Sequence, residues 1–425
     1  MSGERGEGDF GKAVLLFTNF FLIILIYTIV RPVRNALVVT QLGAQALPYL
    51  WIATAACVGV FVTIYGRVLD LVSRRWILSV TISGFFVLLL AIHCFLGGKA
   101  AWPGAVFYVW GDVFSVVMME QFWSLTNDTF DATRAKRWYG FIGAGAVIGG
   151  FVGSILTSFL VHKIGTVHLV FICEALIVVL FGTAFHAQSI RKSVPKVKVA
   201  GTPGSNELFA GFKLVGNYPY LSLLLLFVVL TEVITNVIDF QFNTLLQEMH
   251  PGMDQKTAFL ANVNLAINII SVSMTLFFAS PIHRRLGVLG GLLVLPLSNF
   301  IGAALLILFP VPMILIGLKC CSKGFDYSIH RVSKEMLYIP TPAEVKYKAK
   351  AVIDMFGYRV SELVGSLLLL PFIALIGTKH VNFMTIALEG CVLGIVIVLV
   401  QYYQGLQAGT RTLDPSLEPE PSLSI

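Results

Sequence analysis

The stretch GRVLDLVSRR, residues 66–75, separates two uninterrupted apolar runs at 46–66 and 76–96. A helix needs about 20 apolar residues to cross the hydrocarbon core of a bilayer. Each run has that length, and the quoted stretch is polar and basic. It therefore indicates a short loop between two membrane-spanning helices, and the rest of the chain repeats this pattern.

The composition extends this interpretation to the whole chain. Of the 425 residues, 56% are hydrophobic and 12% are charged, whereas a soluble protein of this length carries about twice that share of charge. The sequence predicts an all-α integral membrane protein with twelve transmembrane helices. They are expected at 13–38, 46–66, 76–96, 104–127, 139–161, 167–188, 219–243, 257–280, 286–309, 311–338, 348–376 and 380–403.

Basic residues are distributed unevenly between the loops. Alternate loops are rich in Lys and Arg, namely GRVLDLVSRR, DATRAKRW, IRKSVPKVK, HRR and EVKYKAK. The opposite loops hold Lys99, Lys163, Lys256 and Lys379. Because basic loops stay on the cytoplasmic side, both termini are predicted to be cytoplasmic. The asymmetry also accounts for most of the net charge of +7, so no nucleic-acid partner is expected.

The longest interior loop, 189–207, is basic and rich in Pro, Gly and Ser, which is typical of a linker. It divides the predicted spans into an N-terminal bundle, 1–188, and a C-terminal bundle, 208–404, of six helices each. Residues 405–425 are acidic and Pro-rich and are expected to be a disordered tail.

The opening loop also carries a motif. Gly66, Asp70, Arg74 and Arg75 stand in the frame G-x-x-x-D-x-x-x-R-R, which resembles the signature of the major facilitator superfamily at the same loop. The equivalent loop of the second half keeps the pair Arg284–Arg285. This repetition favours two related six-helix bundles. Ordinary positive-inside charge is the alternative explanation.

The fifth predicted span contains glycines spaced by four residues. Gly145, Gly149 and Gly153 fall on one helical face. We interpret them as positions where a neighbouring helix approaches closely, because glycine has no side chain to hold the backbones apart.

In the major facilitator superfamily the first, fourth, seventh and tenth helices line a central cavity, and here polar residues concentrate on those spans. They form four polar stripes, each along one helical face: Tyr27, Arg31, Arg34 and Asn35; Asp112, Glu120, Gln121, Ser124, Asn127 and Asp128; Glu232, Asn236, Asp239 and Asn243; and Lys319, Lys323, Asp326, His330 and Lys334. The eleventh span adds Asp354, Tyr358 and Glu362.

A charge at the centre of a bilayer costs roughly 2.5–3.5 kcal/mol, so charged residues that persist there serve a substrate or a gate by default. The arginine pair in the first span, Arg31 and Arg34, suits a phosphate or carboxylate because guanidinium offers forked donors. The stripes hold more acids than bases, however. Structural salt bridges between helices, and acids that bind protons or cations, are the alternatives.

Three stretches resemble the plastid and intracellular-bacterial ATP/ADP translocases. They are YTIVRPVRNALVVTQLGAQALPYL in the first span, QFWSLTNDTFDATRAKRWYGFIGAGA around the fourth, and KGFDYSIHRVSKEMLYIPTPAEVKYKAKAVIDMFGYRV between the tenth and eleventh. The resemblance covers landmarks in both halves. It implies a carrier of the major facilitator type that exchanges nucleotides.

The resemblance also assigns charges residue by residue. The family's first-helix lysine falls on Arg34, and its glutamates on the fourth and seventh helices fall on Asp128 and Asp239. The basic residue after the latter falls near Asn243, where the charge is lost. The family's eleventh-helix lysine falls on Glu362, where the sign is reversed. A less charged anion, or a nucleotide held differently, is therefore also considered.

Together these observations predict a secondary transporter of a nucleotide or another anionic metabolite, working by alternating-access exchange. The residues assigned to substrate binding are Arg31, Arg34, Asn127, Asn236, Asn243, Lys319 and Lys323, and those assigned to gating or coupling are Asp128, Glu232, Asp239, Asp326, Asp354 and Glu362. The alternatives are a proton- or cation-coupled carrier of another solute and a non-transporting scaffold or sensor. No enzymatic, metal or cofactor site is predicted, lipids are the expected surroundings, and the default state is a monomer.

Overall fold

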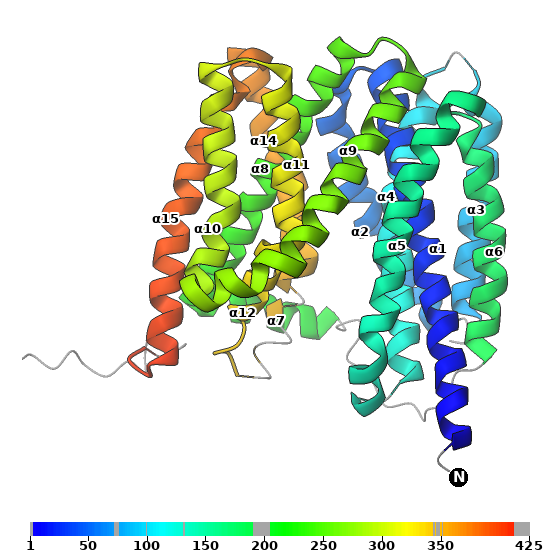
Figure 1. The fold of residues 1–425 in the computed structure, drawn as a ribbon, viewed down its shortest axis with the longest axis horizontal. Coiled ribbons are helices and arrows are strands. Elements are labelled where there is room, and N and C mark those ends of the chain that lie inside the picture. Colours follow the sequence, from blue (N-terminus) through cyan, green and yellow to red (C-terminus); the bar gives the residue numbers. More distant parts are fainter. Residues whose placement is uncertain are drawn as a thin grey trace, which may run out of the picture. The chain divides into compact units, whose positions relative to one another are not determined.

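The computed structural model of the protein describes residues 3–71, 76–98, 100–130, 132–189, 205–342, 345, 349–350 and 352–411. Within these ranges every regular element is a helix (Figure 1). Ten segments of the described chain are long and apolar enough to cross a membrane. The predicted fold class, an all-α integral membrane protein, is confirmed.

The first six predicted spans each correspond to one helix. The helices are α1 (Gly3–Gln41), α2 (Leu47–Leu71), α3 (Ile77–Leu96), α4 (Trp102–Thr129), α5 (Ala132–Ile164) and α6 (Leu169–Ser189). In the loop motif, Gly66 and Asp70 belong to the end of α2, while Arg74 and Arg75 lie outside the described residues.

The second half of the chain contains both long helices and short connecting turns. Its helices are α7 (Ser205–Asn217), α8 (Pro219–Met249), α9 (Met253–Ser273), α10 (Ala279–Leu308), α11 (Pro312–Phe325), α12 (Arg331–Met336), α14 (Gly357–Ile376) and α15 (Val381–Gln407). Helix α7 begins inside the segment predicted to be a linker, and α15 extends into the predicted tail. Three π-helical turns, 274–278, 326–330 and 352–356, continue or precede these helices.

Two features reconcile the ten apolar segments with twelve spans. The segment Met253–Leu308 has 56 residues, more than twice what one crossing needs. Gly287 interrupts it with φ 64° and ψ −161°, a conformation that glycine adopts readily, so the chain turns there into a second crossing. The predicted span 311–338 corresponds to α11 and α12, which the π-helical turn Asp326–His330 joins into one helical path.

The chain forms two compact units. The first comprises residues 1–201 and 243–268, and the second comprises 202–242 and 269–425. Helices α8 and α9 therefore each contribute to both units, and the sequence pattern alone places the boundary differently, at the linker.

Helix α1 occupies the centre of the first unit and contacts α4, α5 and α6. A Cβ atom on Gly145 or Gly149 would lie 2.6 Å from a backbone oxygen of α1, that of Phe17 or Phe21 respectively. A Cβ on Gly153 would lie 2.9 Å from Thr28. The predicted close approach along the glycine face of α5 is confirmed, and the neighbouring helix is α1.

The segment 243–268 is attached to the rest of the first unit by polar contacts. The Ala44 amide donates to Gln247 Oε1 at 2.7 Å. The amide and the hydroxyl of Thr166 both donate to Asp254 Oδ1, at 2.7 and 2.6 Å. The segment 243–268, hereafter the α8–α9 hairpin, thus supplies hydrogen-bond acceptors to donor groups in the rest of the first unit.

In the second unit α10 contacts α11, α12 and α15. Helix α14 packs on α8 through glycines: a Cβ on Gly357 would touch Val228, and one on Gly365 would lie 3.7 Å from the side chain of Asn236. The Tyr220 hydroxyl donates to the Leu337 carbonyl at 2.6 Å, which ties α8 to the end of the α11–α12 path. These contacts bring α8 together with α14 and with the end of the α11–α12 path.

Candidate functional site

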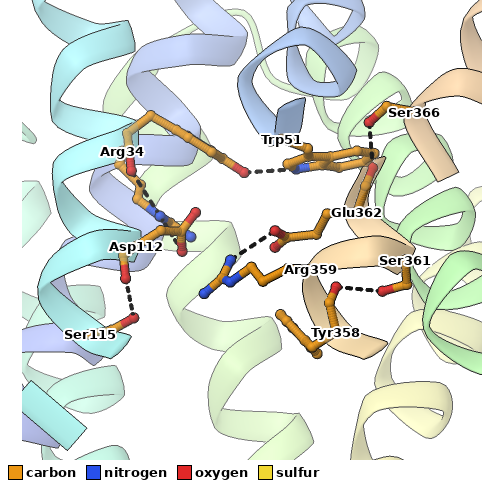
Figure 2. A network of polar contacts seen from close by, with 10 residues as sticks. Arg34, Trp51, Asp112, Ser115, Tyr358, Arg359, Ser361, Glu362 and Ser366 are labelled. Atoms are coloured by element: carbon orange, nitrogen blue, oxygen red, sulfur yellow. Dashed lines mark hydrogen bonds and ion pairs between the residues drawn. The ribbon is translucent and has the colours of Figure 1, made fainter. Parts of the chain in front are cut away.

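An arginine in α1 is held by α4 in the interior of the first unit. Arg34 Nη1 lies 2.6 Å from Asp112 Oδ1, and the same nitrogen donates to the Tyr108 carbonyl at 3.0 Å (Figure 2). The guanidinium also lies 4.4 Å from the centre of the Tyr108 ring. The side chains of Arg34 and Asp112 are 6% and 16% exposed, so water screens the ion pair only weakly.

The local sequence explains how Arg34 reaches this position. A Cβ on Gly111 would lie 2.9 Å from Val30 and 3.1 Å from Arg34, so the glycine beside Asp112 makes room for α1. Trp51 Nε1 donates to the Tyr108 hydroxyl at 2.9 Å and fixes the ring against which the guanidinium lies (Figure 2). The Nε of Arg34 is buried and has no hydrogen-bond partner among the described residues.

The other predicted residues of the first unit lie on partly exposed helical faces. Arg31 is half-buried on the same face of α1 as Tyr27 and Asn35. On α4, Asn127 is exposed and accepts a hydrogen bond from the Tyr139 hydroxyl at 2.6 Å, while Asp128 is half-buried.

A second cluster lies in the second unit, where α8 and α11 meet. Lys319 forms a short ion pair with Asp239. Lys323 Nζ lies 3.7 Å from Asp326 Oδ2, and both lysines are buried. Glu232 is close enough to Lys323 and Asp326 to interact electrostatically with both. The structure therefore brings Glu232 and Asp239 of the α8 stripe close to the lysines at the start of the tenth-span stripe.

The remaining predicted residues of the second half fall into different surroundings. Asn236 on α8 lies against Gly365 of α14. Asn243 is 4% exposed and belongs to the first unit, apart from the other stripe residues of α8. Asp354 accepts a hydrogen bond from Lys334 at 3.0 Å, which ties the π-helical turn before α14 to α12.

Two charged residues of these networks have no role in the sequence-based assignment. Arg359 on α14 donates to Glu362 Oε2 at 2.8 Å, although the sequence pattern singled out only Glu362 (Figure 2). Asp112 stood on the α4 stripe without an assigned role, yet it is the partner of Arg34. Its position two turns before Glu120, within an apolar run, was the signal available in the sequence.

The two charged clusters share one chemical feature, which is the pairing of buried cations with carboxylates. Each buried arginine or lysine described above has a carboxylate beside it, as expected because an isolated buried charge is very costly. Arginine donors in such a setting bind phosphate or carboxylate oxygens strongly, often in a bidentate manner. A mobile anion that replaces a resident carboxylate is thus compatible with both clusters.

Comparison with known proteins agrees with this architecture. Residues 16–325 match the model of the Major Facilitator Superfamily, which is well over half of the chain. The chain therefore belongs to the major facilitator superfamily of membrane transporters.

A narrower similarity follows in the C-terminal part. Residues 298–408 match the model described as TLC ATP/ADP transporter. "ADP,ATP carrier protein 1" of Chlamydia trachomatis serovar D is 26% identical over an alignment covering 84% of this chain and 81% of the relative. "ADP,ATP carrier protein 3" of Rickettsia bellii is 22% identical over 79% of this chain and 82% of the relative.

Solved structures support the fold. The nucleoside transporter NupG superposes with a TM-score of 0.62 at 12% identity, covering 92% of this chain and 98% of that chain. The POT family transporter PepTSo superposes with a TM-score of 0.61 at 14% identity, covering 93% and 98%. At these identities the likeness concerns the fold alone.

Proposed function

We propose that the protein is a secondary transporter of the ATP/ADP translocase type, which exchanges a nucleotide or another phosphorylated anion across the membrane by alternating access. The observation that carries the proposal is the buried Arg34, whose Nε–H has no hydrogen-bond partner among the described residues. It stands in the segment that resembles the translocases. The relatives named ADP,ATP carrier proteins supply the nucleotide as the substrate to test first.

In this proposal the cations of the polar stripes hold the transported anion. Arg31 and Arg34 on α1 and Lys319 and Lys323 on α11 bind the phosphate groups, and Asn127, Asn236 and Asn243 supply amide contacts. The acids Asp128, Glu232, Asp239, Asp326, Asp354 and Glu362 act in gating or coupling. Alternating exposure of a fixed site to the two sides of the membrane then moves the anion.

The proposed setting is a bacterial inner membrane with both termini in the cytoplasm and a single chain as the working unit. The basic loops support the orientation. Cysteine accessibility to a membrane-impermeant reagent, at residues placed in the 189–207 loop and near residue 99, tests it.

Uptake of labelled ATP into proteoliposomes preloaded with ADP tests the function. We expect uptake to require internal ADP and to fall to the empty-vesicle level in Arg34→Ala. Arg137→Ala is a matched control, because Arg137 is exposed and its guanidinium lies over the Trp138 ring, 5.0 Å from the ring centre. A monodisperse wild-type protein without ADP-dependent uptake would contradict nucleotide exchange and redirect the search to smaller anions or proton-coupled solutes.

A further inference from the structure

The first two turns of α14 carry an ion pair that no assigned role explains. Arg359 Nη1 donates to Glu362 Oε2 at 2.8 Å, and the guanidinium lies 5.5 Å from the centre of the Tyr358 ring (Figure 2). The two side chains are 19% and 10% exposed. The pair is therefore largely shielded from water, yet the arginine is not fully enclosed.

This pair adjoins the charged cluster of the second unit. Tyr358, which stands beside Arg359, is close enough to Lys323, Glu232 and Glu362 for electrostatic interaction with each of them. Lys323 interacts in turn with Asp326, in the π-helical turn after α11, and with Glu232 of α8. Through Tyr358 the α14 pair thus lies near Lys323, one of the lysines to which substrate binding is assigned.

The contact between Arg359 and Glu362 contributes little to the stability of α14. The contact itself joins two positions three residues apart on one helix. Such a pair adds little to a helix that is already formed. Placing two charges within a membrane span is costly, and apolar residues of similar volume would serve packing at least as well. Their presence there favours a role in binding.

From this geometry we infer that Arg359 binds the phosphate of the transported anion and that Glu362 is its resident counter-ion, which the anion displaces. The inference rests on the proposed function and names a residue of its site. It resolves the sign reversal at Glu362, because a positive charge is present one helical turn earlier. A guanidinium offers the forked donors that a phosphate accepts, and Glu362 keeps it paired while the site is empty.

The test measures binding of ATP and of inorganic pyrophosphate to the purified full-length protein, with ATP/ADP exchange in proteoliposomes alongside. Glu362→Gln removes the competing carboxylate, and we expect both ligands to bind about two- to fivefold more tightly. Arg359→Ala is expected to weaken both by about tenfold or more, because a charge-assisted hydrogen bond is lost. The double variant Glu362→Gln with Arg359→Ala should bind both ligands as weakly as Arg359→Ala alone, because Glu362 competes with the anion only for the guanidinium of Arg359.

Glu335→Gln is the matched control. Glu335 is paired with Lys350 at 2.5 Å but is 45% exposed, so its neutralisation should leave both affinities unchanged. If Arg359→Ala is not monodisperse, Arg359→Lys replaces it, and intermediate binding is expected because the charge remains without the fork. Wild-type affinity in either arginine variant, or an effect of Glu362→Gln no larger than that of Glu335→Gln, overturns the inference.

The two ligands separate this inference from the proposed function. Wild-type protein that binds pyrophosphate with the expected order of variants, but shows no ATP/ADP exchange, upholds the role of Arg359 and overturns nucleotide exchange. Wild-type protein that binds neither ligand overturns both.

Discussion

At the scale of single residues, the buried pair between Arg34 and Asp112 is a strong local constraint in the first unit. Asp112→Ala leaves the guanidinium buried without its carboxylate. We expect the free energy of unfolding to fall by about 1–3 kcal/mol, because the surviving charge keeps its desolvation cost. Thermal unfolding in detergent, converted with the measured unfolding enthalpy, checks this value.

The pair of Asp9 and Arg134 provides the comparison. It joins α1 to α5 at 3.2 Å, and Arg134 is 34% exposed. Asp9→Ala should change stability by less than about 1 kcal/mol, as exposed ion pairs do. Equal losses in Asp9→Ala and Asp112→Ala would show that burial of the Arg34 pair contributes nothing.

The sequence indicated which residues share a polar helical face, but it did not indicate how they pair. The stripes follow from helical periodicity, which is a local property, so Arg34, Lys319 and Lys323 could be found in the sequence. The partner of Arg34 is Asp112, which lies on another helix. Arg34 can reach it because Gly111 has no side chain and leaves room for α1. The sequence pattern did not single out Arg359, because it stands one position beyond Tyr358 and lies outside the helical face formed by positions 354, 358 and 362.

At the scale of helices, the contact between α1 and α5 depends on the absence of side chains. Gly149→Ala would place a Cβ 2.6 Å from the Phe21 carbonyl oxygen, which is backbone and cannot rotate away. We expect a loss of about 1–3 kcal/mol in unfolding free energy, as overpacking typically causes. Gly143→Ala on the same helix meets nothing within 4 Å and should be neutral or stabilising by up to about 1 kcal/mol. Thermal unfolding of both variants in detergent checks the difference.

The turn within α10 is a second position where the backbone requires a glycine. Gly287 has φ 64°, where a side chain is strained whatever the surrounding space. Gly287→Ala should lower the unfolding free energy by about 1–2 kcal/mol. Gly317→Ala in α11 serves as the control, because it meets no atom within 4 Å and lies in regular helix. Equal thermal unfolding of the two variants would contradict the assignment of strain to Gly287.

Span positions were predictable because apolar length is a property of each segment alone. The interruptions were not. A π-helical turn such as Asp326–His330 leaves no mark in hydrophobicity, and the break before the ninth span falls at Gly287 rather than within His283–Arg285. Helix α7 was missed because the composition of the adjoining 189–207 segment is that of a linker.

At the scale of the whole molecule, the α8–α9 hairpin belongs to the first unit although most of α8 belongs to the second. Asp254→Ala removes the acceptor for two donors of Thr166. We expect faster hydrogen–deuterium exchange of the backbone amides in 243–268, because local opening becomes easier. Exchange in the earlier part of α8 should stay unchanged. Glu248→Gln, an exposed acid of the same hairpin, is the control and should alter neither region.

The position of the α8–α9 hairpin in the sequence has a consequence for fragments of the chain. A fragment ending at residue 189 would lack part of its own unit, because 243–268 lies beyond the linker in sequence. The Ala44 amide and the Thr166 amide and hydroxyl would lose the acceptors that Gln247 and Asp254 provide. Splitting the gene at the linker is therefore expected to leave the N-terminal fragment unable to complete its own unit. We therefore expect the N-terminal fragment to fold fully only when a C-terminal fragment carrying 243–268 is supplied for complementation.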